Sequence, residues 1–206
     1  MILYRVLLLS LASVACLAQK PKGLPKGVIY QEAENFRSQT KDEVRKWIVV
    51  DKSSTEKAVQ QAGGNAYIHC VPDTRATRDD KMMKGTNFSD VPGQLAVLTY
   101  PVKFKKPGRY YVWVKAYSTG SEDNGIHVGL NDTWPESGQR IQWCEGKNKW
   151  TWSNSQRTVE VHCGVPHLIY LDVPAAGTHD IQFSMREDGL RMDAFLLTMD
   201  REYVPE

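Results

Sequence analysis

Arg109-Tyr110-Tyr111-Val112-Trp113-Val114-Lys115-Ala116-Tyr117 is the stretch that decides the fold class. In an extended chain its side chains divide between two faces. One face carries Tyr110, Val112, Val114 and Ala116, and the other carries Tyr111, Trp113 and Tyr117. Both faces are apolar enough to be covered, which is typical of a strand in the middle of a two-layer sandwich, where aromatic rings belong to the core.

The same alternation recurs from residue 28 to residue 199, with turn residues between the segments and no long helical pattern. We therefore predict an all-β domain over residues 27–206. One turn of helix is expected over Thr40–Lys46, and a long irregular excursion over Pro72–Pro92. The predicted strands are Val28–Glu34, Trp47–Val50, Ala66–Val71, Gln94–Phe104, Arg109–Tyr117, Gly125–Leu130, Arg140–Cys144, Thr158–His162, His167–Val173, Thr178–Met185 and Met192–Met199.

Residues 1–18 have the layout of an export signal, with Arg5 followed by a short apolar run and small residues around position 16. Cleavage before Gln19 leaves residues 19–26 as a Lys/Pro/Gly tether and places the mature chain outside the cytoplasm, secreted, in a periplasm or at a cell surface. The alternative is a lipoprotein acylated at Cys16. We rank it second, because the residue three positions before that cysteine is Ser13 rather than a branched apolar one.

The charge balance argues against nucleic acid or an anionic membrane as the main partner. The chain carries 26 basic and 24 acidic residues, for a net charge of +2, and loss of Arg5 with the signal leaves a near-neutral protein. Both of those partners call for a clustered excess of Lys and Arg.

Three cysteines remain in the mature chain, namely Cys70, Cys144 and Cys163. Their spacing does not fit a structural zinc site. Cys144 and Cys163 each end a strand-like run, which makes them the candidate disulfide in an oxidising compartment. Three buried thiols are the equally weighted alternative.

Three segments together resemble family 6 and family 35 carbohydrate-binding modules. They are Tyr30–Glu34 with its Glu-Ala-Glu, the Pro107–Val114 hairpin strand, and Met192–Thr198 with an embedded aspartate. The resemblance spans nearly the whole mature chain and implies a jelly-roll β-sandwich of two antiparallel sheets. The layout is also similar to the C-terminal β-sandwich of family 115 glycoside hydrolases.

The resemblance implies a structural Ca²⁺ site formed by Glu32, Glu34 and Asp193. The residues agree with it, because two glutamates two positions apart leave one face of a strand and their like charges need a cation. Hard oxygen ligands suit Ca²⁺. The alternative is an ordinary ion pair of either glutamate with an arginine such as Arg191.

Four of the six tryptophans fall within Trp134–Trp152, interleaved with polar side chains. Aromatic faces pack against sugar C–H groups, so at least one of these rings is expected at the surface. Trp150 and Trp152 share a face in an extended chain. By resemblance Trp150 is the sugar platform and Trp152 supports it, whereas Trp143 is expected in the core.

The resembling modules place a polar loop beside the platform, just before the last strand. Here that loop holds Arg186, Glu187 and Asp188, which we predict to bond sugar hydroxyls. Arg186 would also suit an acidic or sulfated sugar. An ordinary solvated turn is the alternative interpretation.

The sequence predicts a secreted, non-catalytic module that binds a polysaccharide or oligosaccharide, acting either alone or beside a separate glycoside hydrolase. It contains neither G-x-S-x-G nor H-E-x-x-H, and its five histidines are scattered. The alternatives are an adhesive module that binds a protein partner and an accessory domain with weak hydrolase activity.

Overall fold

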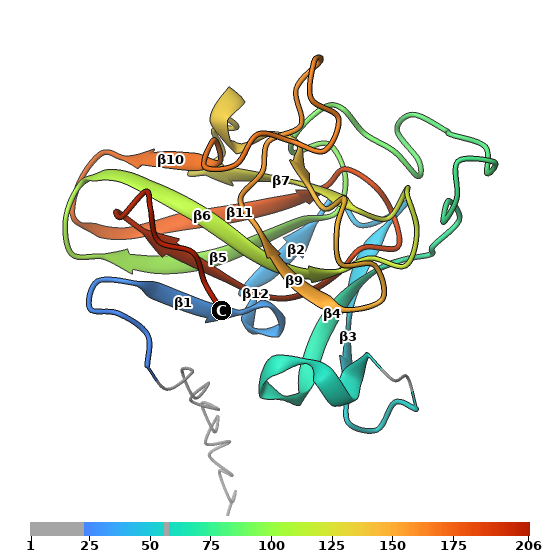
Figure 1. Ribbon diagram of the computed structural model, residues 1–206, viewed down its shortest axis with the longest axis horizontal. Helices are drawn as coiled ribbons and strands as arrows, with labels where there is room; N and C mark the ends of the chain where they lie inside the picture. Colours follow the sequence, from blue (N-terminus) through green and yellow to red (C-terminus); the bar gives the residue numbers. More distant parts are fainter. Residues whose placement is uncertain (1–22, 56–57) are drawn as a thin grey trace, which may run out of the picture.

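The chain folds as a sandwich of two antiparallel β-sheets, seen in a computed structural model that describes residues 23–55 and 58–206 (Figure 1). The seven-stranded sheet contains β1 (Ile29–Glu32), β3 (Lys46–Asp51), β4 (Ala66–Val71), β6 (Gly108–Tyr117), β9 (Trp150–Ser153), β10 (Tyr170–Val173) and β12 (Arg191–Thr198). The five-stranded sheet contains β2 (Ser38–Thr40), β5 (Val97–Phe104), β7 (Gly125–Leu130), β8 (Ile141–Gln142) and β11 (Gly177–Met185).

The chain crosses between the two sheets from β4 to β5, from β5 to β6, from β6 to β7 and again from β11 to β12. This is jelly-roll connectivity. The predicted all-β jelly-roll sandwich is therefore confirmed. The connections include one-turn 3₁₀ helices, among them η1 (Ala33–Asn35), η2 (Val59–Gln61), η3 (Gly63–Asn65) and η4 (Glu136–Gly138). The predicted export signal and the start of the tether lie outside the described residues.

Strand β6 lies in the middle of its sheet, between β12 on one side and β9 and β10 on the other. Its inward side chains join the main core, which fills the space between the sheets. Its outward Trp113 joins a second cluster with Tyr30, Ala194 and Leu196. The prediction that both faces of this strand are covered is confirmed, and the second cluster places aromatic side chains on the outer face of the sandwich.

Two local predictions are wrong. The segment predicted as strand Thr158–His162 is a turn, in which the Val161 N–H donates to Thr158 Oγ1 at 3.0 Å and Val159 is 99% exposed. Polar and apolar residues do alternate in this segment, but no strand among the described residues pairs with it. The helical turn predicted over Thr40–Lys46 is absent, because Lys41 has a φ of +54°, which a right-handed helix does not accept.

The excursion over residues 72–92 is irregular, as predicted, and its ordered contacts include isolated bridges such as Phe88 to Glu187. Within residues 23–55 and 58–206, no helix has the length and apolar content needed to cross a bilayer.

One open side of the sandwich is bridged by a single side chain. Gln39 on β2 donates from Nε2 to the Trp47 carbonyl at 3.2 Å and accepts from the Trp47 N–H at 2.7 Å. Strands β2 and β3 are edge strands of different sheets. The amide of Gln39 therefore completes the hydrogen bonds that a further strand would make at this position.

Candidate functional site

A pocket of about 610 Å³ lies on the outer face of the seven-stranded sheet. Trp152 of β9 lines one side, and Tyr30 and Glu32 of β1 line the other. Between them lie Lys115 of β6 and Leu196 of β12. Strand pairing sets this arrangement, because Trp152 pairs with Lys115 and Tyr30 pairs with Leu196. We call this space the outer-face pocket.

Segments outside the sheet also line the outer-face pocket. They are Gly23–Pro25, the C-terminal tail Tyr203–Glu206, and Gly63 and Gly64 of η3. Trp152 Nε1 donates to the Glu206 carbonyl at 3.2 Å and so ties the tail to the pocket lining. Figure 1 shows the C-terminus near the tip of β1.

Trp150 lies on the same face as Trp152, as predicted, but it packs into a neighbouring cluster. Its half-buried ring lies 5.3 Å from the Tyr67 ring and 5.4 Å from the Tyr117 ring, and its Nε1 donates to the Ala58 carbonyl at 3.1 Å. Of the two tryptophans, Trp152 is the one that lines the outer-face pocket.

The three predicted calcium ligands converge on Gly63 and Gly64. A Cβ on Gly63 would lie 3.2 Å from Asp193 Oδ2, and one on Gly64 would lie 3.3 Å from Glu34 Oε1 and 3.5 Å from Glu32 Cδ. A side chain at either position would press against the carboxylates, and Gly64 also has a φ of +56°, which favours glycine. In the described part of the chain, no three His, Cys, Asp or Glu side chains stand close enough together to hold a metal ion as they are placed.

The carboxylates have fewer partners than their burial demands. Glu34 Oε2 and Asp193 Oδ1 are buried and accept no hydrogen bond from the described residues. Asp193 Oδ2 lies 2.8 Å from Lys115 Nζ in an ion pair, and Glu32 accepts from the Tyr30 hydroxyl at 3.0 Å. The remaining unpaired hard oxygens are chemically suited to Ca²⁺.

The electrostatics reflect this surplus of negative charge. Burial raises the pKa of Glu34 to about 7, with the charges of Glu32 and Asp193 adding to the effect. Burial is also the main cause of the raised pKa of Glu32. The pKa of the Tyr30 hydroxyl is raised by burial and by Glu32. A cation in this place would relieve all three groups.

The loop before β12 does not form the exposed turn that its predicted role requires. Arg186, Glu187 and Asp188 are only 2%, 2% and 0% exposed. They lie in the connection from β11 to β12, between the excursion over residues 72–92 and the loop before β7, and none of them lines the outer-face pocket. The physical reason is that each finds its partners inside the protein.

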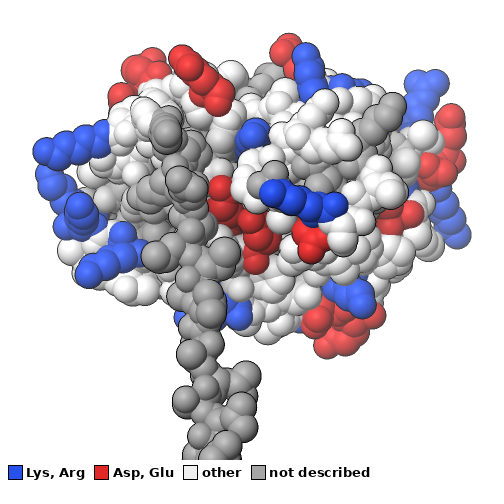
Figure 2. Space-filling view, turned by 90° about the horizontal axis from the view of Figure 1, so that it is seen from below, with Lys and Arg blue, Asp and Glu red and all other residues white. Residues whose placement is uncertain are grey.

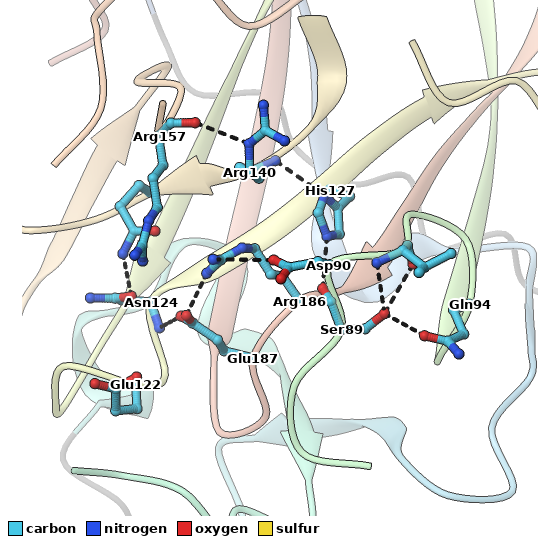
Figure 3. A network of polar contacts seen from close by, with 12 residues as sticks. Ser89, Asp90, Gln94, Glu122, Asn124, His127, Arg140, Arg157, Arg186 and Glu187 are labelled. Atoms are coloured by element: carbon cyan, nitrogen blue, oxygen red, sulfur yellow. Dashed lines mark hydrogen bonds and ion pairs between the residues drawn. The ribbon is translucent and has the colours of Figure 1, made fainter. Parts of the chain in front are cut away.

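Arg186 and Glu187 belong to a buried polar network (Figure 3). Arg186 Nη1 pairs with Glu187 Oε1, and Arg186 Nη2 lies 3.6 Å from Asp90 Oδ1. The guanidinium also stands 4.9 Å from the centre of the Phe88 ring. Glu187 Oε2 accepts from the Asn124 N–H at 3.0 Å. These contacts join the loop before β12 to two other loops.

Asp188 makes a similar connection with one carboxylate oxygen. Its Oδ2 accepts from Arg45 Nε at 2.9 Å, from the Thr74 N–H at 3.1 Å and from Thr74 Oγ1 at 2.8 Å. Arg45 is 5% exposed. This buried ion pair holds the start of the long excursion against the last strand, so the side chain is structural.

His127 completes the polar network from the five-stranded sheet. Its Nδ1 accepts from the Arg140 N–H at 3.1 Å, and its Nε2 lies 3.1 Å from the Ser89 carbonyl, so the ring is the neutral tautomer protonated at Nε2. Burial lowers the pKa of His127 to about 3. We use "polar network" for Arg186, Glu187, Asp90, Asn124 and His127, together with the ion pair of Arg45 and Asp188.

Cys144 and Cys163 form a disulfide, whereas Cys70 is a buried free thiol. Of the two interpretations left open by the sequence, the disulfide is confirmed. It encloses the segment that carries Trp150 and Trp152. Trp143, just before it, is 4% exposed and donates to the Thr151 carbonyl, which confirms its predicted place in the core.

Sequence reasoning missed Tyr30, Lys115 and the tail as parts of this site. The role of Lys115 could have been predicted from the sequence, because between residues 111 and 117 it is the one cation on the face that also carries Tyr111, Trp113 and Tyr117. A lysine on a covered face requires a carboxylate partner. Tyr30 lies two residues before Glu32 and hence on the same face.

The surface seen in Figure 2 carries acidic and basic side chains in mixture.

No protein-family model matches the chain. Uncharacterized protein P23 of Formosa agariphila is 54% identical over 187 residues, which cover 87% of this chain and 45% of that protein. The chain thus spans less than half the length of this curated relative.

Among solved structures, a family 35 carbohydrate-binding module from Paenibacillus barcinonensis is 12% identical, with a TM-score of 0.48, over 84% of this chain and 99% of the module. The C-terminal family 6 module of the laminarinase LamC from Zobellia galactanivorans is 15% identical, with a TM-score of 0.44, over 83% of this chain and 98% of the module. The predicted likeness to family 115 glycoside hydrolases stays a prediction.

Proposed function

We propose that this protein is a non-catalytic carbohydrate-binding domain that holds a polysaccharide or oligosaccharide in the outer-face pocket. The observation that carries the proposal is the composition of this pocket, where the Trp152 ring stands beside polar groups of Lys115, Glu32 and Tyr30. An aromatic face next to a few fixed hydrogen-bonding groups is the chemistry that a pyranose ring requires. The volume of about 610 Å³ suits a small ligand.

In this proposal Trp152 is the stacking platform and Trp150 supports it from the neighbouring cluster. Lys115 donates to sugar oxygens, and the Glu32 carboxylate accepts from hydroxyls. We assign no sugar contact to Arg186, Glu187 or Asp188, since they are buried at a distance from the pocket. Export by the signal at residues 1–18 and action beside a separate glycoside hydrolase complete the proposed role.

We also propose one Ca²⁺ held by Glu32, Glu34 and Asp193, with Lys115 balancing the remaining charge. Its support is the set of buried carboxylate oxygens without hydrogen bonds and the raised pKa of Glu34. The bound cation stabilises the junction of β1, η3 and β12. Because Glu32 also lines the outer-face pocket, we expect chelation to weaken sugar binding as well as the fold.

The test is a glycan array followed by calorimetry on Trp152→Ala. Losing the platform should cost ~1–3 kcal/mol of binding free energy, while Trp152→Phe keeps most of the affinity because it retains an aromatic face. Trp134→Ala is the matched control, since Trp134 is half-buried and lies outside the pocket lining.

Unchanged affinity of a folded Trp152→Ala protein would refute the proposed platform. Silence toward every glycan, combined with capture of a defined protein ligand, would favour the adhesive role instead.

A further inference from the structure

The chain turns back on itself after its last strand. The Asp200 N–H donates to Thr198 Oγ1 at 3.1 Å, and the Glu202 N–H donates to Asp200 Oδ1 at 3.0 Å. These two bonds stabilise a turn in the backbone directly after β12. The tail Tyr203–Glu206 then returns to the outer face of the sheet that β12 has just left, where it lines the outer-face pocket.

The tail engages the polar group of Trp152. Trp152 Nε1 donates to the Glu206 carbonyl at 3.2 Å, and Tyr203 packs against the second cluster, on which Trp152 also packs. An indole has a single N–H and no other donor. A ligand that stacks on Trp152 can therefore accept a hydrogen bond from this ring only when the Glu206 carbonyl releases it.

Few contacts hold the tail in this place. Within residues 199–206 only Tyr203 and Pro205 are half-buried, and the other side chains are exposed. Ordering the backbone of the tail costs conformational entropy, and the hydrogen bond and the half-buried ring offset little more than that cost. Trp152, by contrast, is held in β9, which pairs with β6. Of the two partners in the hydrogen bond between Trp152 and Glu206, the tail is therefore the one that can move.

We propose that the tail Tyr203–Glu206 is a strap that competes with carbohydrate for Trp152. In the unliganded protein the strap accepts the hydrogen bond of the indole N–H. A sugar that stacks on Trp152 accepts this hydrogen bond with one of its own oxygens, and the strap leaves the sheet. The exchange replaces one hydrogen bond by another, so its cost is mainly the packing of Tyr203. This inference rests on the proposed function and concerns the regulation of the same site.

The first measurement follows the Trp152 indole N–H by NMR in the full mature chain, as wild type and as Tyr203→Ala. The variant removes the half-buried ring and keeps the Glu206 carbonyl. We expect the indole N–H to exchange with water several-fold faster in the variant. Arg201→Ala is the matched control, since Arg201 is exposed, lies in the same segment and does not line the pocket. It should leave the exchange rate unchanged.

The second measurement is calorimetry with cello-, xylo-, manno- and galacto-oligosaccharides. For the oligosaccharide that binds most tightly, the affinity of Tyr203→Ala should be several-fold higher than that of the wild type, and the affinity of Arg201→Ala should equal it. Saturating the wild type with the same oligosaccharide should move the backbone amide resonances of Tyr203 and Glu206 to positions typical of an unstructured peptide. The saturation experiment needs no variant, so it decides the question even if Tyr203→Ala does not fold.

Equal or weaker affinity of a folded Tyr203→Ala protein, or tail resonances that stay in place at saturation, would overturn the strap and leave the carbohydrate-binding function intact. Binding by Tyr203→Ala alone, with a silent wild type, would support the strap most strongly. A lack of binding to every oligosaccharide by both proteins would overturn the proposed function itself, and the strap with it.

Discussion

The outer-face pocket and the polar network both hold charged side chains out of water, and they treat them in opposite ways. In the polar network each charge faces a partner, as Arg186 faces Glu187 and Asp90. Beside the pocket, Lys115 pairs with Asp193, whereas the buried oxygens Glu34 Oε2 and Asp193 Oδ1 accept no hydrogen bond from the described residues. A buried charge without a partner is costly. The paired region is therefore suited to hold loops together, and the unpaired one to receive something from outside.

This difference shows that a polar loop predicted to bind a ligand can instead be buried and hold the fold together. The loop holding Arg186, Glu187 and Asp188 resembled a binding loop because it is polar and precedes the last strand. Its polar groups make their hydrogen bonds and ion pairs within the protein. Lys115 and Tyr30 were not predicted as site residues, although they line the outer-face pocket.

Asp188→Ala tests the paired side of the comparison and should have the largest effect. It removes the acceptor of Arg45 and Thr74 and leaves a guanidinium buried without its partner, which costs about 3–5 kcal/mol of the free energy of unfolding. Urea denaturation measures this loss. The exposed pair Arg109 with Asp172 gives the control, because Asp172→Ala should cost less than about 1 kcal/mol.

Calorimetry on the folded fraction of Asp188→Ala should show unchanged sugar affinity. If the variant folds normally and binding disappears, the loop before β12 is a sugar contact after all and the division between the two regions fails.

The pH dependence of stability should differ in sign between the two regions. Glu34 has a folded pKa of about 7 against an ordinary 4.5, so the folded state binds more protons and stability falls as pH rises through that window. Because Glu34 is only half-buried, solvent screening reduces the fall to about 1–2 kcal/mol in protein stripped of cations. His127 has a folded pKa of about 3 against 6.5, so its contribution to stability rises with pH between those values.

Urea denaturation from pH 4 to pH 8 on chelator-treated protein measures the two slopes, with Glu34→Gln and His127→Gln each removing one of them. Excess Ca²⁺ should abolish the fall due to Glu34, because the cation favours the ionised carboxylate. Equal slopes for the wild type and Glu34→Gln, with no effect of Ca²⁺ on either, would eliminate the proposed cation site.

Trp150→Ala sharpens the comparison within the outer face and should have the smallest effect. The ring is half-buried against Tyr67 and Tyr117, so we expect a loss of about 1–2 kcal/mol in the free energy of unfolding. Sugar affinity should fall less than in Trp152→Ala. A larger loss of affinity for Trp150→Ala, with the fold intact, would restore Trp150 as the main platform.

The fold was predictable because its signals are local and repeated. Alternation in residues 109–117 identified the central strand, and Cys144 and Cys163 were recognisable as a pair. The turn at residues 158–162 was mistaken for a strand because alternation shows which side chains face the same way and does not show whether another strand lies alongside.

The sequence predicted which kinds of groups the site contains, but not all of the residues that supply them. Glu32, Glu34 and Asp193 lie around Gly63 and Gly64, and their role as Ca²⁺ ligands stays a prediction. The tail Tyr203–Glu206 could not be found, since no sequence pattern says where the residues after the last strand, 199–206, come to rest. Whether Arg186 faces water or Asp90 depends on the path of the excursion over residues 72–92, and irregular loops leave no periodic signal.

The amide of Gln39 should limit self-association of the protein at high concentration. A free strand edge is a template on which another chain can add its own strand, and this is a common first step toward aggregates. Gln39 already occupies the donor and acceptor of Trp47 on the edge strand β3, whose Ile48 and Val49 are exposed apolar residues. The Gln39 side chain thus blocks the pairing of another strand with the edge strand β3. We expect Gln39→Ala to leave the chain folded but more prone to self-association on storage.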